Sequence, residues 1–333
     1  MNWLTYEAGP EISIVVPCYN EELVLPATAA RLRAIAELFE TSFEIIYVDD
    51  GSRDRTAEIL AELQRSDPQV RVVYLARNFG HQIALTAGLE HASGAAVVVI
   101  DADLQDPPEV ILEMIARWRD GYDVVYGTRE RREGESAFKL NTAKFFYRLM
   151  GRISSIPIPL DTGDFRLMDR RVIEALKAMP ERDRFVRGMV SWVGFRQTSV
   201  RYSRAARQAG ESKYSTLKML RFAVDGILSF SNVPLHVATF SGLAAISLGV
   251  LVAIATIAGS MLGKPWLTGW MCVLIAVFFM GGVQLLSLGM VGEYLWRIYG
   301  ESKRRPLYLV REVLGFEQDS PEAAKAMAAR GRN

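Results

Sequence analysis

Three acidic residues follow a short apolar run in the first third of the chain, and their spacing suggests metal chemistry. Val97–Ile100 is followed by Asp101, Asp103 and Asp106 and then by two prolines. In an extended chain, side chains two residues apart point the same way, so we expect Asp101 and Asp103 to face one side. Two convergent carboxylates can hold a hard cation, Mg²⁺ or Mn²⁺, with positions left for phosphate oxygens. A solvated acidic turn is the alternative.

Two other strand-like segments also end in polar residues. Asp49 and Asp50 follow the run FEIIYV, and Tyr19 and Glu21 follow the run EISIVVPC. Tyr19 could stack on a base, and Asp50 could accept hydrogen bonds from uracil or ribose. We therefore predict a nucleotide site whose diphosphate sits on the metal. Because the sequence holds neither the glycine pattern of a dinucleotide-binding loop nor a P-loop, those ligands are not expected.

The elements that must position these residues alternate between strand-like and helix-like segments. Helices are predicted at 21–39 and 56–64. The predicted strands are 11–16, 43–48, 70–75, 95–100 and 122–127. Continuous valine and isoleucine runs are typical of parallel strands covered on both faces, and the alternation predicts a doubly wound α/β sheet. Ligands bind such sheets at the carboxyl ends of the strands, where polar segments such as ARNFGHQ and GTRERR also fall.

Two later stretches are apolar enough to cross a membrane. Residues 226–263 and 265–292 contain no Asp, Glu, Lys or Arg. About 20 apolar residues suffice for one helical crossing, so we predict two transmembrane helices with a short turn at Lys264. A long buried core helix is the alternative reading of either stretch.

Basic residues flank both predicted spans, whereas the turn between them has one lysine. The flanking residues are Lys213, Lys218, Arg221, Arg297, Lys303, Arg304 and Arg305. The positive-inside rule therefore predicts a two-span protein of the cytoplasmic membrane with the N-terminal domain and both termini in the cytoplasm. Two basic amphipathic segments, 138–152 and 214–230, are predicted to lie in the membrane interface. Ordinary packing helices of the α/β domain remain the alternative for both segments.

Composition narrows the possible partners. The 333 residues carry a formal net charge of +1, and no basic stripe or nucleic-acid motif stands out, so no nucleic-acid partner is expected. The two cysteines, Cys18 and Cys272, are too few for a disulfide framework or a cysteine-rich zinc site.

The strand-end motifs together resemble a known family. VVPCYNE, VDDGSRDRT, DADLQDPPE and the later TGDFR are similar to family 2 glycosyltransferases with the GT-A fold, and more narrowly to the polyprenyl-phosphate glycosyltransferases. Within these, the chain resembles dolichyl-phosphate mannose synthases and bacterial bactoprenol glucosyltransferases from residue 11 to about residue 312. The resemblance implies a catalytic domain at 1–212, an interfacial helix at 213–232, two spans within 233–296 and a cytoplasmic tail at 297–333.

The resemblance also implies roles for individual residues. Asp164 would be the catalytic base, and Asp103 with Gln105 would hold the metal. The residues implied to bind the nucleotide-sugar are Pro17, Tyr19, Glu21, Val48, Asp50, Asp101, Ala102 and Gln105. The residues implied to bind the acceptor phosphate are Arg129, Arg207 and Lys213.

The reaction implied is a metal-dependent, inverting transfer of one sugar to a polyprenyl phosphate such as undecaprenyl phosphate. UDP-glucose is the favoured donor, and a UDP-aminoarabinose derivative, a UDP-N-acetylhexosamine or GDP-mannose are alternatives. The Q-x-x-R-W motif of processive polymerases is missing, which favours a single transfer. A phosphate monoester is already mostly dianionic near pH 7, so Asp164 could fix a sugar hydroxyl instead of taking a proton. A homo-oligomer is expected. A sugar-phosphate nucleotidyltransferase and a non-enzymatic membrane scaffold are the other classes considered.

Overall fold

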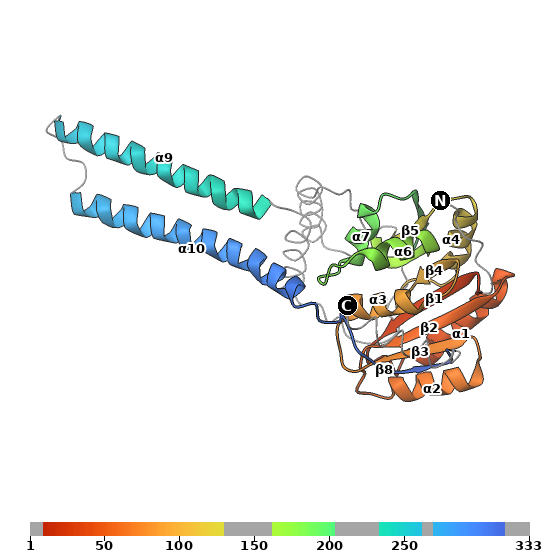
Figure 1. The fold of residues 1–333 in the computed structure, drawn as a ribbon. Coiled ribbons are helices and arrows are strands. Elements are labelled where there is room, and N and C mark those ends of the chain that lie inside the picture. Colours follow the sequence, from red (N-terminus) through yellow and green to blue (C-terminus); the bar gives the residue numbers. More distant parts are fainter. Residues whose placement is uncertain (1–8, 130–161, 204–232, 262–268, 317–333) are drawn as a thin grey trace. The chain divides into compact units, whose positions relative to one another are not determined.

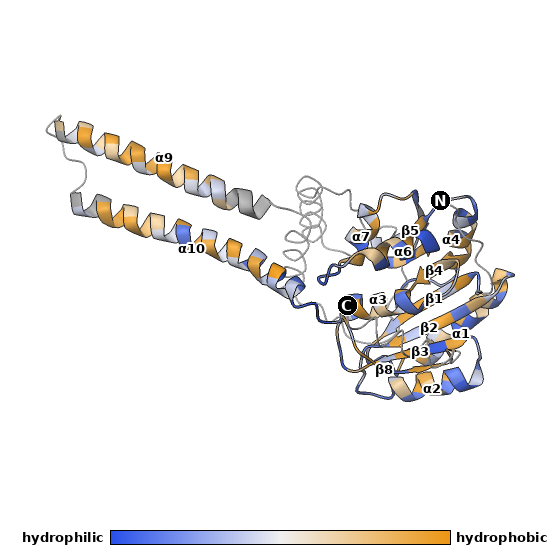
Figure 2. Cartoon of the chain, in the orientation of Figure 1, coloured by the Kyte–Doolittle hydropathy of each residue, from blue (hydrophilic) through white to orange (hydrophobic). Residues whose placement is uncertain are grey.

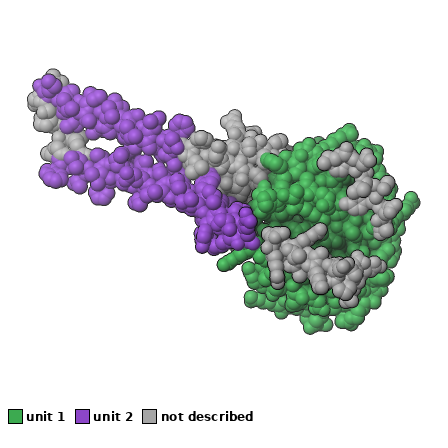
Figure 3. All heavy atoms as spheres, viewed as in Figure 1, with its two compact units in different colours: residues 1–151, 156–214, 305–333 green, residues 152–155, 215–304 purple. Residues whose placement is uncertain are grey.

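A computed structural model describes residues 9–129, 162–203, 233–261 and 269–316. The predicted interfacial segments, Arg207, Lys213 and Lys264 lie outside the described residues. The chain divides into two compact units, coloured in Figure 3 and described separately here. The first comprises residues 1–151, 156–214 and 305–333, and the second comprises residues 152–155 and 215–304.

An eight-stranded, mostly parallel sheet forms the centre of the first unit (Figure 1). Its strands are β1 (Ile12–Cys18), β2 (Phe43–Asp49), β3 (Val70–Leu75), β4 (Ala96–Val99), β5 (Val124–Arg129), β6 (Thr162–Asp169), β7 (Gln197–Tyr202) and β8 (Val310–Leu314). They lie in the order β7-β5-β6-β4-β1-β2-β3-β8. Strands β1 to β4 pair in parallel, as does β5 with β7, whereas β6 and β8 run antiparallel to their neighbours.

Helices cover both faces of this sheet. The helices of the first unit are α1 (Leu25–Ala36), α2 (Thr56–Ser66), α3 (His81–His91), α4 (Val110–Arg119), α6 (Arg170–Ala178) and α7 (Val186–Trp192). A short 3-10 helix, Glu37–Phe39, follows α1. Buried side chains of α1, α2 and α4 belong to one hydrophobic cluster, and those of α3, α6 and α7 belong to another. The central strands are buried on both sides, which confirms the doubly wound α/β sheet predicted from their valine and isoleucine runs.

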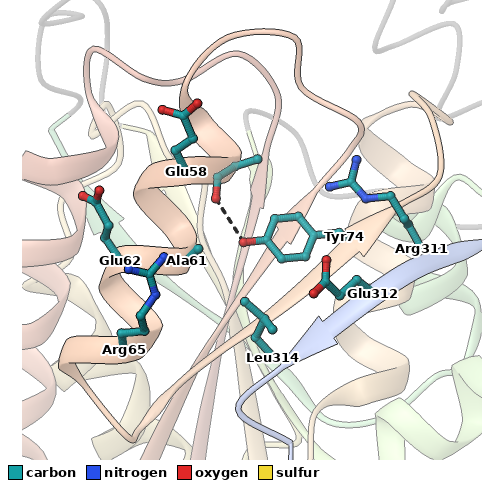
Figure 4. Close-up of a pocket in the computed structure, with 9 residues that line it drawn as sticks. Glu58, Ala61, Glu62, Arg65, Tyr74, Arg311, Glu312 and Leu314 are labelled. Carbon is teal, nitrogen blue, oxygen red and sulfur yellow. Dashed lines mark hydrogen bonds between the residues drawn. The ribbon is translucent and has the colours of Figure 1, made fainter.

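Strand β8 was not foreseen from the sequence, which assigned residues 297–333 to a tail. Val310–Leu314 instead pairs with β3 and forms one edge of the sheet. A surface hollow of about 440 Å³ lies between α2, β3 and β8 (Figure 4). Tyr74 crosses it and donates a hydrogen bond to the carbonyl oxygen of Ala57 over 3.0 Å. Its charged lining mixes three glutamates with two arginines and includes none of the predicted site residues.

The second unit contains two long apolar helices, α9 (Val233–Met261) and α10 (Gly269–Ser302), which pack against each other. Figure 2 shows how apolar residues dominate both helices. Ala238–Gly259 and Val273–Ser302 are each long and apolar enough to cross a membrane, and almost none of their side chains is buried. Helix α10 continues to Ser302, beyond the predicted end of the second span at residue 296.

Candidate active site

The loops that follow β1 and β2 are joined by hydrogen bonds. The backbone N–H of Asn20 donates to the Ser52 hydroxyl over 3.0 Å, and the N–H of Glu21 donates to the Thr56 hydroxyl over 2.8 Å. In return, the Asn20 side chain accepts a 2.8 Å bond from the backbone of Arg53. Asn20 adopts a positive φ of 55°, which asparagine tolerates better than most residues. The predicted nucleotide residues Tyr19 and Glu21 are therefore held, half-buried, on one connected surface.

Asp50 joins this surface to the loop after β3. Its two carboxylate oxygens accept hydrogen bonds from the backbone N–H groups of Phe79, at 2.7 Å, and Gly80, at 2.9 Å. Burial raises the pKa of Asp50, and these two hydrogen bonds oppose the rise. Gly51 beside it has φ +68°, and a Cβ there would lie 2.5 Å from the backbone of Arg77. Asp50 thus organises two loops, and its oxygens keep further lone pairs for a ligand.

Four of the predicted nucleotide-binding residues are buried: Pro17, Val48, Asp50 and Ala102. Val48 is fully buried in the cluster between the sheet and α3, and Ala102 is 3% exposed. The Ala102 carbonyl accepts a 2.6 Å hydrogen bond from the Thr28 hydroxyl. Pro17 lies within the buried strand β1. Any contact of Val48 or Ala102 with a nucleotide would therefore involve backbone atoms.

The aspartates that follow β4 lie in a turn. Strand β4 ends at Val99, and Leu104 adopts a positive φ of 55°, so the extended geometry expected through Asp103 is wrong. The turn places Asp103 so that its carboxylate accepts a 3.1 Å bond from the backbone N–H of Gln105. Polar groups that must serve a ligand commonly lie just beyond a strand, where the backbone is free to turn.

Strand β6 brings Asp164 to this turn. Val99 of β4 pairs with Arg166 of β6, and the strands are antiparallel. Asp164 lies two residues before Arg166 on β6, and the turn that holds Asp101 begins where β4 ends, so the two aspartates come close enough to contact one imidazole. The imidazole of His81, at the first residue of α3, lies between them, with Nε2 3.4 Å from Asp164 Oδ2 and 3.6 Å from Asp101 Oδ1. Gln82 adds a 2.9 Å hydrogen bond from Nε2 to Asp164 Oδ2.

The pKa values of these groups are coupled by their proximity. Burial alone would lower the pKa of His81, but the hydrogen bond with Asp164 and the charge of Asp101 raise it from 6.5 to about 9. Burial raises the pKa of Asp101 to about 6; His81 opposes this rise, and Asp164 and Asp103 add to it. Burial would also raise the pKa of Asp164, yet His81, Arg187 and Arg166 hold it well below its ordinary range. The site thus contains an imidazolium between two carboxylates of unequal acidity.

Comparison with known proteins decides what family this site belongs to. Residues 13–177 match the family described as Glycosyl transferase family 2. An uncharacterized glycosyltransferase of Bacillus subtilis, YkcC, is 49% identical over 92% of this chain and 95% of that protein. A bactoprenol glucosyl transferase of Shigella phage SfV is 44% identical over 90% of this chain and 98% of that protein. The chain belongs to glycosyltransferase family 2. Its predicted identity as an enzyme that transfers a sugar is confirmed.

A solved structure aligns with this glycosyltransferase at lower similarity. The mannosyltransferase PcManGT of Pyrobaculum calidifontis, in complex with GDP-Man and Mn²⁺, is 20% identical over 85% of this chain and 88% of that chain, with a TM-score of 0.43. Family membership by sequence excludes the nucleotidyltransferase and the non-enzymatic scaffold as alternatives.

Four side chains of this glycosyltransferase site were not singled out from the sequence. They are His81, Gln82, Arg166 and Arg187. His81 and Gln82 lie in ARNFGHQ, a segment predicted to end a strand, and Arg166 lies in TGDFR, so motif position was a partial signal. Arg187 had no such signal. Of the predicted acceptor residues, Arg129 is the last residue of β5, whereas Arg207 and Lys213 lie outside the described residues.

The described residues fit a divalent cation that is shared with a substrate. Asp101 Oδ1 is buried and has no hydrogen-bond partner within the described ranges, and Asp103 follows in the same turn. The described part of the chain contains no group of three or more His, Cys, Asp or Glu side chains placed to form a protein-only cage. Mg²⁺ usually binds through one or two carboxylates plus substrate phosphates. The aspartates after β4 match that mode of binding.

The pKa of His81 predicts how stability depends on pH. A group whose pKa is raised on folding stabilises the fold below its unfolded pKa, near 6.5, and loses that effect as pH rises through about 9. Because the imidazole is 45% exposed, solvent screening should reduce the contribution of His81 to the free energy of unfolding to about 1 kcal/mol. We expect urea unfolding, with a chelator present, to give the wild type a higher free energy of unfolding than His81→Gln. This difference should be larger at pH 6 than at pH 10. An equal difference at both pH values would contradict the pairing.

Proposed function

We propose that this family 2 glycosyltransferase moves one sugar from a nucleotide-sugar, with UDP-glucose favoured, to a polyprenyl phosphate at the membrane. The observation that carries the proposal is the His81 imidazole, which lies 3.6 Å from Asp101 in the turn after β4 and 3.4 Å from Asp164 on β6, in a chain that also has two membrane-length helices. The first feature suits sugar transfer, and the second suits a lipid acceptor. The 44% identity to a protein named bactoprenol glucosyl transferase agrees with both.

The donor would bind along the carboxyl ends of β1, β2 and β4. Tyr19 and Glu21 would contact the nucleoside together with Asp50, and Asp101 would contact the sugar. Asp103 and Gln105 would hold Mg²⁺ or Mn²⁺ with the donor diphosphate. A bound cation of this kind neutralises the charge that develops on a leaving diphosphate.

Asp164 is better suited to orienting a substrate than to removing a proton. Its neighbours stabilise the carboxylate and hold its pKa well below its ordinary range, which makes it a weak base at neutral pH. The acceptor phosphate is already mostly dianionic near pH 7 and needs little activation. We therefore assign Asp164 the role of fixing a sugar hydroxyl so that the anomeric carbon faces the acceptor.

The second unit would anchor the enzyme in the cytoplasmic membrane. Near the end of α10, the Lys303 ammonium lies 4.1 Å from the centre of the Tyr299 ring and 5.7 Å from that of Trp296. Tyrosine and tryptophan concentrate where a transmembrane helix meets the headgroups, and lysine concentrates on the cytoplasmic side. This end of α10 is accordingly proposed to lie at the cytoplasmic interface. A homo-oligomer stays a prediction.

Cysteine labelling tests this topology. In a background with Cys18 and Cys272 replaced by serine, Lys264→Cys should react with a membrane-impermeant maleimide added to intact cells. Arg305→Cys should react only after the cells are opened, because positive flanks stay inside. Labelling of Arg305→Cys in intact cells would place the catalytic unit on the other side of the membrane.

Purified protein and a panel of radiolabelled donors test the reaction itself. UDP-glucose, UDP-N-acetylglucosamine, a UDP-aminoarabinose derivative and GDP-mannose would each be supplied with and without undecaprenyl phosphate. We expect radiolabel to enter the lipid fraction for one donor, with UDP-glucose favoured, and only when the lipid phosphate is present. Donor consumption that is indifferent to undecaprenyl phosphate would overturn the proposed acceptor.

A further inference from the structure

Arg187, the second residue of α7, contacts a different oxygen of Asp164 from the one that faces His81. One of its terminal nitrogens lies 3.5 Å from Asp164 Oδ1, whereas His81 and Gln82 contact Oδ2. The Arg187 side chain is 20% exposed, and that of Asp164 is 13% exposed. The Arg187 guanidinium and the imidazole that faces Asp101 therefore share one carboxylate, each through its own oxygen.

Gln82 fixes the start of α7 in this position. Its Oε1 accepts a 3.1 Å hydrogen bond from the backbone N–H of Val186, while its Nε2 donates to Asp164. One side-chain amide thus ties β6 to the helix that carries Arg187. The guanidinium also lies 5.9 Å from the centre of the Phe185 ring, at the outer limit of a cation–π contact.

The hydrogen-bonding capacity of Arg187 exceeds what its described surroundings use. A guanidinium has five N–H donors, and the 3.5 Å contact with Asp164 is long for a charge-assisted hydrogen bond. Its Nε is buried, with no hydrogen-bond partner in the ranges that the structure describes. Buried donors are rarely left unpaired in native proteins, so this arrangement suits an anion that pairs with the remaining N–H groups.

Stereochemistry indicates which anion this is. In an inverting displacement, the attacking oxygen and the leaving diphosphate lie on opposite sides of the anomeric carbon. The donor diphosphate belongs with Asp103 in the turn after β4, on the Asp101 side of Asp164. An anion bound by Arg187 would lie at Asp164 Oδ1, away from the oxygen that faces His81, and this is the position we assign to the attacking group.

We propose that Arg187 binds the phosphate of the polyprenyl-phosphate acceptor, an inference that rests on the function proposed above. A planar guanidinium can donate two parallel hydrogen bonds to a phosphate, which fixes its orientation as well as its position. Asp164, between this phosphate and His81, keeps the acceptor apart from the donor diphosphate by charge repulsion.

Steady-state kinetics of the full-length enzyme with undecaprenyl phosphate tests the role. Arg187→Ala should raise the KM for undecaprenyl phosphate roughly tenfold or more, because hydrogen bonds to charged groups contribute about 1.5–3 kcal/mol. The KM for whichever donor the wild type uses should change less than twofold. Arg187→Lys should recover part of the loss, and Arg117→Ala, which removes an exposed arginine of α4, should behave like the wild type.

One further variant separates binding from positioning. Gln82→Leu loosens Asp164 and the start of α7 but keeps the guanidinium, so it should lower kcat and raise the KM for undecaprenyl phosphate less than Arg187→Ala does. A rise in that KM that is as large for Gln82→Leu as for Arg187→Ala, or a pure kcat effect in Arg187→Ala, would overturn the proposal. An equal rise in the donor KM in Arg187→Ala would assign Arg187 to the diphosphate and overturn it as well. If Arg187→Ala does not fold, the same comparison is made with Arg187→Lys. If the wild-type enzyme turns over its donor at the same rate with and without undecaprenyl phosphate, the proposed function itself would be contradicted.

Discussion

Replacing Asp103 with asparagine is expected to lower sugar transfer a hundredfold or more. The substitution keeps the size of the side chain but removes a formal charge and a strong oxygen ligand. Since Mg²⁺ binds through few protein carboxylates, losing one should cripple metal-dependent donor binding. Removing electrostatic stabilisation of a transition state typically costs about a hundredfold or more in turnover. The fold should survive, because asparagine can still accept the hydrogen bond from Gln105 that shapes the turn.

Transfer rate against Mg²⁺ and Mn²⁺ concentration measures this effect, with thermal melting as the check on folding. Glu109→Gln is a suitable control. It removes a carboxylate from the same loop, and that carboxylate is exposed and paired with Arg31. That variant should keep both its activity and its metal dependence. A folded Asp103→Asn protein with near-normal turnover and an unchanged metal requirement would refute the metal site.

Replacing Asp164 with asparagine should affect activity and stability together. Arg166 is 4% exposed, and Arg187 is mostly buried, so removing the carboxylate leaves two cations without their shared counter-charge. Breaking a buried ion pair from one side typically destabilises a protein by about 3 kcal/mol or more. Turnover should also fall by about a hundredfold or more, because a substrate is no longer held in line with the acceptor.

Urea unfolding and the pH dependence of kcat/KM distinguish the two possible roles of Asp164. Its pKa lies well below its ordinary range, so the fractional loss in Asp164→Asn should stay constant between pH 6 and pH 8 when both proteins also carry His81→Gln, which removes the imidazole whose pKa Asp164 raises. Glu113→Gln, an exposed carboxylate of α4, serves as the control and should match the wild type in both measurements. A loss that grows with pH across this range would instead indicate a titrating general base.

Strand prediction succeeded where the pattern was local. The apolar runs at 11–16, 43–48, 70–75, 95–100 and 122–127 correspond to β1 through β5, with small differences at the ends. Such runs are recognisable because both faces of a central parallel strand must be apolar. Strand β6 escaped this rule, since TGDFRLMD mixes acids and arginines with apolar residues. Its buried Arg166 is tolerated because Asp164 lies beside it, a compensation that periodicity does not reveal.

The sequence by itself determined the parallel core, the acidic ends of β2 and β4, and two helices of membrane length. These features depend on the composition of short segments, so each can be recognised from its own segment alone. Only the tertiary structure decided that His81, at the start of α3, contacts both Asp101 after β4 and Asp164 on β6, and that α7 supplies Arg187. These contacts join residues far apart in the chain, and they exist because strand order and helix packing bring those residues together. Charges matched across such distances leave no periodic trace in the sequence.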